Sequence, residues 1–183
     1  MSEGVHQLRA ARKRQKGESG PLEANLSAVQ VAERETVISG QLVERLRATA
    51  PRTVRARRRI PFVLRRWVKI AVDGPVAEKW KLGYLVDTIY LRDVWMHRID
   101  ATRATRRDMV LTADHDGRII ADVVGEWARR HGCPFTLELT GEAGGRFFVG
   151  EGGESIVIDA LEFCRTLAGR SPGNGLLTTV VPF

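Results

Sequence analysis

The sequence has few cysteines and no long apolar run. Cys133 and Cys164 are the two cysteines among 183 residues, too few for a disulfide framework or a four-cysteine metal site. No apolar stretch approaches the roughly 20 residues that a membrane helix needs, and the first residues contain no apolar signal core. These absences argue against a disulfide-stabilised secreted domain and against a membrane partner. We therefore expect a cytoplasmic protein with reduced, buried thiols.

The composition is that of a globular chain with an uneven charge. Hydrophobic residues make up 43% and charged residues 28%, enough for one ordinary domain or two small ones. Residues 1–70 carry 16 Lys/Arg and 6 Asp/Glu, a balance of +10, whereas residues 71–183 carry the remaining 13 and 16, a balance of −3. The basic excess peaks between Arg52 and Arg59.

The first part of the chain has the spacing of helices. After a polar segment, 1–21, apolar periodicity predicts helices over 22–35, 39–50, 61–70 and 83–104. Ser39 is the expected N-cap of the second helix, and Pro51 its expected stop. Residues 52–59 have helical composition but little apolar content, and Asp73-Gly74-Pro75 predicts a turn.

The second part mixes both periodicities. A helix is predicted over 114–131, ended by Gly132. Alternating residues then predict a strand over 134–140, a hairpin at Gly144-Gly145, and further strands over 146–149, 156–158 and 176–181. A helix is expected over 159–169. The sequence therefore predicts the α+β class, with domains at 22–106 and 107–183.

One stretch, Arg92-Asp-Val-Trp-Met-His-Arg-Ile-Asp100, places two carboxylates and an imidazole on one helix face. Asp93 and His97 are four apart and Asp100 follows three later, so the three share a side. Apolar residues upstream share that side too: Leu82, Leu85, Val86 and Ile89. We therefore expect the trio to point inward, where polar groups need partners. A bound metal is one such partner.

Several phrases, taken in order, resemble the mycothiol-dependent maleylpyruvate isomerase family of the DinB-like superfamily. They are Leu82-Gly-Tyr-Leu-Val-Asp87, the Arg92 to Asp100 stretch, Ala101-Thr-Arg-Ala-Thr105, His115-Asp-Gly-Arg-Ile-Ile-Ala-Asp122, Glu126-Trp-Ala-Arg129, Leu139-Thr-Gly141 and Asp159-Ala-Leu-Glu-Phe-Cys-Arg-Thr-Leu-Ala-Gly-Arg170. The resemblance covers most of residues 22–183.

The resemblance implies a helical bundle that holds a divalent metal, commonly zinc, followed by a small sterol-carrier-like α+β domain. Asp93 and His97 match an acid and a histidine that ligate the metal in the family. The activity implied is mycothiol-dependent isomerisation or thiol transfer on a small molecule, with Arg170, or failing that Arg165, holding a substrate carboxylate. No phrase here matches the family's early ligand histidine, so the resemblance implies an incomplete bundle that lacks its first helix.

Other interpretations of these residues stay open. Asp93 and His97 also fit a hydrogen-bonded pair without metal, and Asp100 fits a salt bridge to Arg98, Arg103 or Arg106. The chain could be a non-catalytic remnant that binds a ligand or partner, and a second copy could cover the incomplete bundle. Arg52–Arg59 could bind nucleic-acid phosphates, although a solvated helix face is the simpler interpretation. The four tryptophans, Trp67, Trp80, Trp95 and Trp127, are expected in the core.

Overall fold

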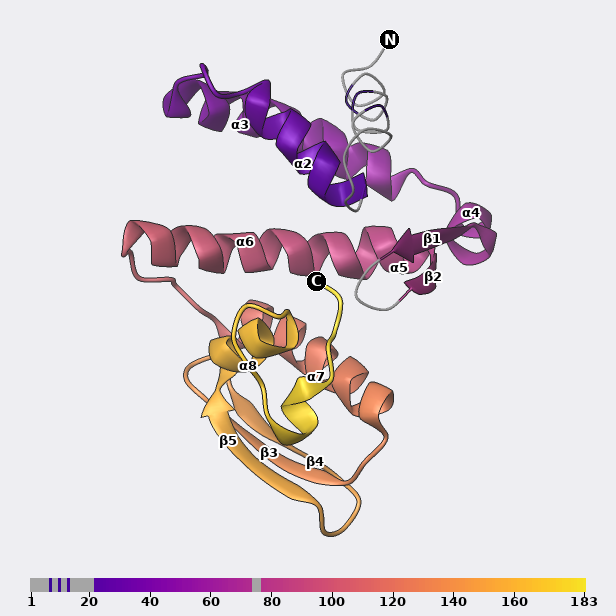
Figure 1. Cartoon of the computed structure of the whole chain (residues 1–183), viewed down its shortest axis with the longest axis vertical. Helices are drawn as coiled ribbons and strands as arrows, with labels where there is room; N and C mark the ends of the chain where they lie inside the picture. Colours follow the sequence, from indigo (N-terminus) through magenta and orange to yellow (C-terminus); the bar gives the residue numbers. More distant parts are fainter. Residues whose placement is uncertain (1–6, 8–9, 11–12, 14–21, 74–76) are drawn as a thin grey trace. The chain divides into compact units, whose positions relative to one another are not determined.

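The computed structural model describes residues 7, 10, 13, 22–73 and 77–183 (Figure 1). Helices and two small sheets make up these residues, so the predicted α+β class is confirmed. The chain divides into two compact units, Met1–Tyr84 and Leu85–Phe183. The polar segment predicted at 1–21, apart from residues 7, 10 and 13, and the turn at Gly74-Pro75 lie outside the described residues. Within the described part, no helix combines the length and apolarity that crossing a membrane requires.

The first unit is mainly helical and buries little. Its elements are α2 (Leu22–Ala32), α3 (Ser39–Arg58), α4 (Phe62–Trp67), β1 (Lys69–Asp73), β2 (Ala77–Lys81) and α5 (Leu82–Tyr84). Val29, 9% exposed, is the one buried hydrophobic side chain in the described part of this unit, and neither α3 nor α4 has a buried residue. The unit therefore presents much of its side-chain surface to solvent.

Helix α3 is longer than the sequence pattern predicts. The expected stop at Pro51 is wrong, because the helix continues through Pro51 to Arg58. Proline removes one backbone donor and weakens a helix, but residues 52–58 are mostly arginine and alanine, which have high helix propensity. The Thr53 hydroxyl also donates to the Thr49 carbonyl at 3.2 Å, across the proline turn.

A two-stranded hairpin follows α4 where the sequence pattern predicts helix. Strands β1 and β2 are antiparallel, with Ile70 opposite Trp80 and Val72 opposite Glu78. The prediction of a helix to residue 70 is therefore wrong beyond Trp67. β-Branched side chains alternate with short or charged ones from Val68 onward, which is the pattern of a strand rather than a helix.

The second unit is a three-stranded sheet with helices. Its elements are a π-helical turn η1 (Leu85–Ile89), α6 (Tyr90–Thr105), a second π-helical turn η2 (Ala113–Gly117), α7 (Arg118–His131), β3 (Phe135–Thr140), β4 (Gly145–Val149), β5 (Glu154–Asp159), α8 (Ala160–Leu167) and the 3₁₀ turn η3 (Gly175–Thr178). The sheet order is β4-β3-β5, with β3 antiparallel to β4 and parallel to β5. Helices α7 and α8 lie over one face of this sheet (Figure 1).

The main hydrophobic core lies in this second unit. Phe135, Leu137 and Leu139 alternate inward along β3, as period-two patterning requires. Trp127 of α7 is fully buried and makes edge-to-face contacts with Phe135 and with Phe163 of α8, at centroid separations of 4.7 and 5.4 Å. Aromatic pairs prefer this geometry, so the two helices and the central strand share one core.

Helix α6 belongs to this core as well. Trp95, Met96 and Ile99 are buried in the same cluster as the α7, β3 and α8 side chains. The unit boundary therefore falls after Tyr84 and not after residue 106, because α6 packs with the elements that follow it. The strand predicted at 176–181 is wrong: this region begins with the 3₁₀ turn η3.

Candidate functional site

Helix α6 is rotated by about one residue position from the predicted orientation. Its buried face consists of Arg92, Trp95, Met96 and Ile99, spaced at i, i+3, i+4 and i+7. Asp93, His97 and Asp100 lie one position further around the helix, and their side chains are 47%, 65% and 36% exposed. The expectation of an inward-pointing trio is therefore wrong, because the larger side chains of Trp95 and Met96 occupy the core face.

Asp93 and His97 nevertheless form a pair on the exposed face. His97 Nε2 lies 3.4 Å from Asp93 Oδ1, and His97 Nδ1 lies 3.7 Å from Asp100 Oδ2. The imidazole thus stands between two carboxylates from its own helix. Both ring nitrogens therefore face a carboxylate oxygen.

Asp100 connects this pair to α8 and to the segment that follows it. Arg170 Nε and Nη2 lie 3.0 and 2.9 Å from Asp100 Oδ2, with Nε also 3.2 Å from Oδ1. Arg165 Nη1 of α8 approaches Asp100 Oδ1 at 3.4 Å. The structure therefore brings together, around one carboxylate, residues that the sequence analysis assigned to two domains.

A wider network of charged groups surrounds this cluster. Arg165 Nε lies 3.5 Å from Glu162 Oε1. This nitrogen atom is buried and has no hydrogen-bond partner. Glu162 also pairs with Arg103 of α6. Asp100 is a salt-bridge residue, as the sequence suggested, but its arginine partners are Arg165 and Arg170 rather than Arg98, Arg103 or Arg106.

The donor set tests whether the residues present fit a divalent metal. Zinc sites use nitrogen and oxygen donors of the kind that His97 and Asp93 offer, and a catalytic site usually has three protein ligands. Among the described residues, no group of three or more His, Cys, Asp and Glu side chains could hold a metal. Asp93 and His97 therefore fit part of a coordination sphere and do not complete one.

A buried arginine on α6 is the charged residue that the sequence analysis missed. Arg92 is 1% exposed, and its Nη1 donates to Glu126 at 2.7 Å and to the Pro182 carbonyl at 3.1 Å. Its Nη2 donates to Asp122 Oδ2 at 2.7 Å. The signal available in the sequence is Asp122 and Glu126 spaced four apart on α7, opposite a lone arginine on the core face of α6.

A buried carboxylate holds the turn before α7 against α6. Asp116 Oδ1 accepts from Trp95 Nε1 at 2.8 Å and from Arg98 at 3.2 Å, and its Oδ2 accepts from the Thr112 amide at 2.8 Å. Burial raises the pKa of Asp116, but these hydrogen bonds and the Arg98 charge outweigh it and lower the pKa below 3.8. Asp116 is therefore a structural anion.

The two cysteines do not offer a reactive thiol to this site. Cys164 is buried, as expected, and burial raises its thiol pKa, which removes nucleophilic character. Cys133 is exposed, contrary to the expectation of two buried thiols. Its amide donates to His131 Nδ1 at 2.9 Å. Any thiol chemistry at the α6–α8 cluster would therefore use an external thiol.

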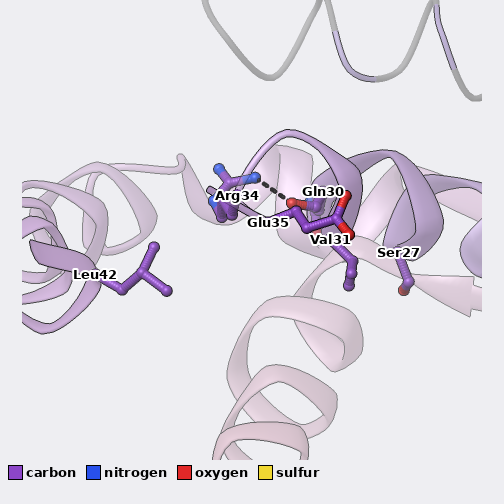
Figure 2. A pocket seen from close by; sticks show the side chains of 6 residues that line it. All are labelled: Ser27, Gln30, Val31, Arg34, Glu35 and Leu42. Atoms are coloured by element: carbon purple, nitrogen blue, oxygen red, sulfur yellow. Dashed lines mark hydrogen bonds between the residues drawn. The ribbon is translucent and has the colours of Figure 1, made fainter. Parts of the chain in front are cut away.

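Several cavities among the described residues lie away from the cluster, and two of them contain charged side chains of interest. One, of about 640 Å³ between α2 and α3, is lined by Ser27, Gln30, Val31, Arg34, Glu35 and Leu42 (Figure 2). Arg34 there donates to the Gln30 carbonyl one turn earlier, at 2.9 Å. The other, of about 260 Å³, adjoins buried Arg92 and is lined in part by Asp87, Arg118 and Asp122. Asp93, His97, Arg165 and Arg170 line neither.

Comparison of the chain with protein-family models, with curated proteins and with solved structures gives no match in any of the three.

Proposed function

We propose that the second unit carries the site of a metal-dependent, mycothiol-linked isomerase or thiol transferase, built on a DinB-like helix and a sterol-carrier-like α+β domain. The observation that supports this most is the convergence on Asp100. His97 contacts both Asp93 and Asp100, and Asp100 in turn contacts Arg165 and Arg170. The first pair resembles metal ligands, and the two arginines resemble a carboxylate clamp.

In this proposal Asp93 and His97 hold a divalent metal, most simply zinc, at the exposed face of α6. When bound there, the metal would lower the pKa of a coordinated mycothiol thiol and so supply a thiolate near neutral pH. The His97 ring lies beside Asp93, so one helical turn presents one nitrogen and one oxygen donor to the same side. Solvent or further donors complete the sphere.

Arg170 and Arg165 would hold the carboxylate of a small-molecule substrate. A guanidinium binds a carboxylate through two parallel hydrogen bonds, and Arg170 already makes that type of contact to Asp100, from Nε to Oδ1 and from Nη2 to Oδ2. Asp100 therefore keeps the two arginines oriented in the free protein. A substrate carboxylate would have to replace Asp100 on one of them, which makes Asp100 a positioning residue.

A non-catalytic remnant that binds a ligand is the second candidate, favoured by two specific observations. Both arginines already have a carboxylate partner in Asp100, and the described residues provide a partial donor set for the metal. A remnant would keep the α6–α8 cluster as a salt-bridge network and would not retain a metal.

Metal analysis of the purified chain after zinc supplementation tests the proposal. We expect a stoichiometric metal in the wild type that is lost in His97→Ala and in Asp93→Asn. His115→Ala is the matched control, because His115 is an exposed histidine elsewhere in the same unit. Wild-type protein without metal would contradict the proposal, as would equal metal retention in His97→Ala and His115→Ala.

A further inference from the structure

A second feature lies in the first unit, on a segment that takes no part in the α6–α8 cluster. From residue 45 to residue 69 the sequence contains no Asp or Glu and ten basic residues: Arg45, Arg47, Arg52, Arg55, Arg57, Arg58, Arg59, Arg65, Arg66 and Lys69. Arg52, Arg58, Arg59 and Arg66 pair with no carboxylate among the residues that the structure describes. The segment is therefore strongly cationic and has little internal compensation.

Large apolar side chains are exposed within this cationic segment. Phe62, Val63 and Trp67 of α4 are 73%, 62% and 71% exposed. At 100° per residue these three and Arg66 fall within about 140° of the helix circumference. The Arg66 guanidinium lies 5.7 Å from the Trp67 ring centroid. The opposite side carries Arg65, whose Nε donates to the Ile60 carbonyl at 3.0 Å.

Helix α3 also places exposed apolar side chains next to arginines. Val43, Leu46 and Val54 are exposed, and their positions lie on one side of the helix at 3.6 residues per turn. Arg47, Arg57 and Arg58 flank this apolar side, whereas Arg45, Arg52 and Arg55 lie on the opposite side. Helices with an arginine-rich face and a Val/Leu/Phe/Trp face are typical of proteins that lie in the plane of a membrane surface.

The positive charge of α3 and α4 favours one binding partner for their exposed surface over the others. A second copy would bring two such cationic segments together, which like-charge repulsion opposes. Nucleic-acid phosphates would satisfy the arginines, but they offer no apolar environment for Val43, Leu46 or Val63. A bilayer that contains anionic lipid offers both phosphate charge and a hydrocarbon boundary.

We propose that α3 and α4 bind peripherally to anionic lipid bilayers. The arginines contact the headgroup phosphates, and Phe62, Val63 and Trp67 enter the boundary between headgroups and acyl chains. The expectation of no membrane partner rested on the lack of a long apolar run, which bears on spanning helices and not on this peripheral mode. The proposed mode is independent of the metal site proposed in the second unit.

Vesicle binding by the full chain tests this surface. Vesicles of phosphatidylcholine with phosphatidylglycerol should bind the protein in a sedimentation assay, whereas pure phosphatidylcholine vesicles should bind it weakly. Added salt should reduce the binding, because exposed charges are screened. Tryptophan emission should shift to the blue on binding, and Trp67→Phe should bind while losing most of that shift.

Two double variants separate the roles of charge and apolar contact. Arg58→Glu with Arg59→Glu, and Phe62→Ser with Trp67→Ser, should each lower the partition coefficient about tenfold or more. Arg146→Glu and Phe148→Ser are matched controls in the second unit, where both residues are exposed; they should change it by less than about twofold. Circular dichroism verifies that each variant is folded.

Several results would overturn the proposal. Absence of binding to anionic vesicles is one, and equal binding to both kinds of vesicle is another. Binding of an arbitrary oligonucleotide without vesicle binding would assign the surface to nucleic acid instead. A dimer in light scattering that the Phe62→Ser, Trp67→Ser double variant dissociates would assign it to self-association.

Discussion

At the scale of single residues, Arg92 is the most consequential charge in the second unit. It is buried with Glu126 and Asp122 as partners, and removing one member of a buried ion pair leaves charge without compensation. We expect Arg92→Met to lower the free energy of unfolding by about 3–5 kcal/mol, measured by urea denaturation. Arg146→Met removes an exposed arginine and should cost under about 0.5 kcal/mol. Equal losses in the two variants would show that the Arg92 network does not stabilise the fold.

His131 gives the second unit a dependence on pH. Burial lowers the pKa of His131 below 6.5, although the Glu154 charge acts in the opposite direction. The unfolded chain therefore binds a proton more readily, so the stability from this group is fully present above pH 6.5 and lost as pH falls through the folded pKa.

The variant His131→Phe tests that dependence and keeps the edge-to-face contact with Trp127. Between about pH 7 and pH 5 its unfolding free energy should fall less steeply than that of the wild type. His115→Phe, at an exposed histidine, should follow the wild-type slope. If His131→Phe keeps that slope as well, the partly buried imidazole is not the cause of the pH dependence.

Residue chemistry was also the easier part of the site to predict from the sequence. The pairing of Asp93 with His97 follows from their spacing, and the structure places them 3.4 Å apart. The involvement of Asp100 with Arg165 and Arg170 did not follow from spacing, because 65 and 70 residues separate them. Such contacts depend on how α8 packs against α6, which no local pattern encodes.

At the scale of elements, amphipathic patterning predicted some helices better than others. Helix α7 and strand β3 have strong one-sided patterns and lie where predicted, with Trp127 and Phe135 in the core. Helix α6 has apolar residues on more than one side, so its orientation could not be fixed from the sequence. The placement of Trp95 in the core was correct, whereas Trp67 of α4 is exposed.

The end of α6 carries a local strain that a substitution should relieve. Arg106 caps this helix with a φ of 51°, the one positive φ outside glycine among the described residues. Left-handed backbone costs a side-chain-bearing residue about 1 kcal/mol or more, whereas glycine adopts it freely. Arg106→Gly should therefore raise the free energy of unfolding by about 0.5–1 kcal/mol.

Arg107→Gly is the matched control for that substitution. Arg107 is an exposed arginine next in the chain and has no positive φ, so glycine there should be neutral or slightly destabilising. Urea denaturation of both variants gives the comparison. Stabilisation by both or by neither would show that the left-handed cap is not a source of strain.

At the scale of the whole molecule, the two units differ in how much they bury. Val29 is the one buried hydrophobic side chain in the described part of the first unit, whereas the second unit contains the clustered core of α6, α7, β3 and α8. Local opening is easiest where few apolar contacts must break. The units should therefore differ in their resistance to opening.

Hydrogen exchange followed by mass spectrometry would measure that difference. Amides of β3 and α7 should exchange slowest, and those of α3 should exchange much faster. Uniform protection across both units would contradict the distribution of buried side chains. The fold class was predictable from the sequence, but this division was not, because α6 lies within the predicted helical part and packs with the elements after it.

The central claim is that Asp93 and His97 present a metal to an external thiol. Absorption spectroscopy of the full chain loaded with Co²⁺ tests it most directly, because a thiolate bound to cobalt gives a sulfur-to-metal charge-transfer band. We expect mycothiol to produce that band in the wild type and in His115→Ala, and to produce none in His97→Ala. No band in the wild type, or an undiminished band in His97→Ala, would contradict the account.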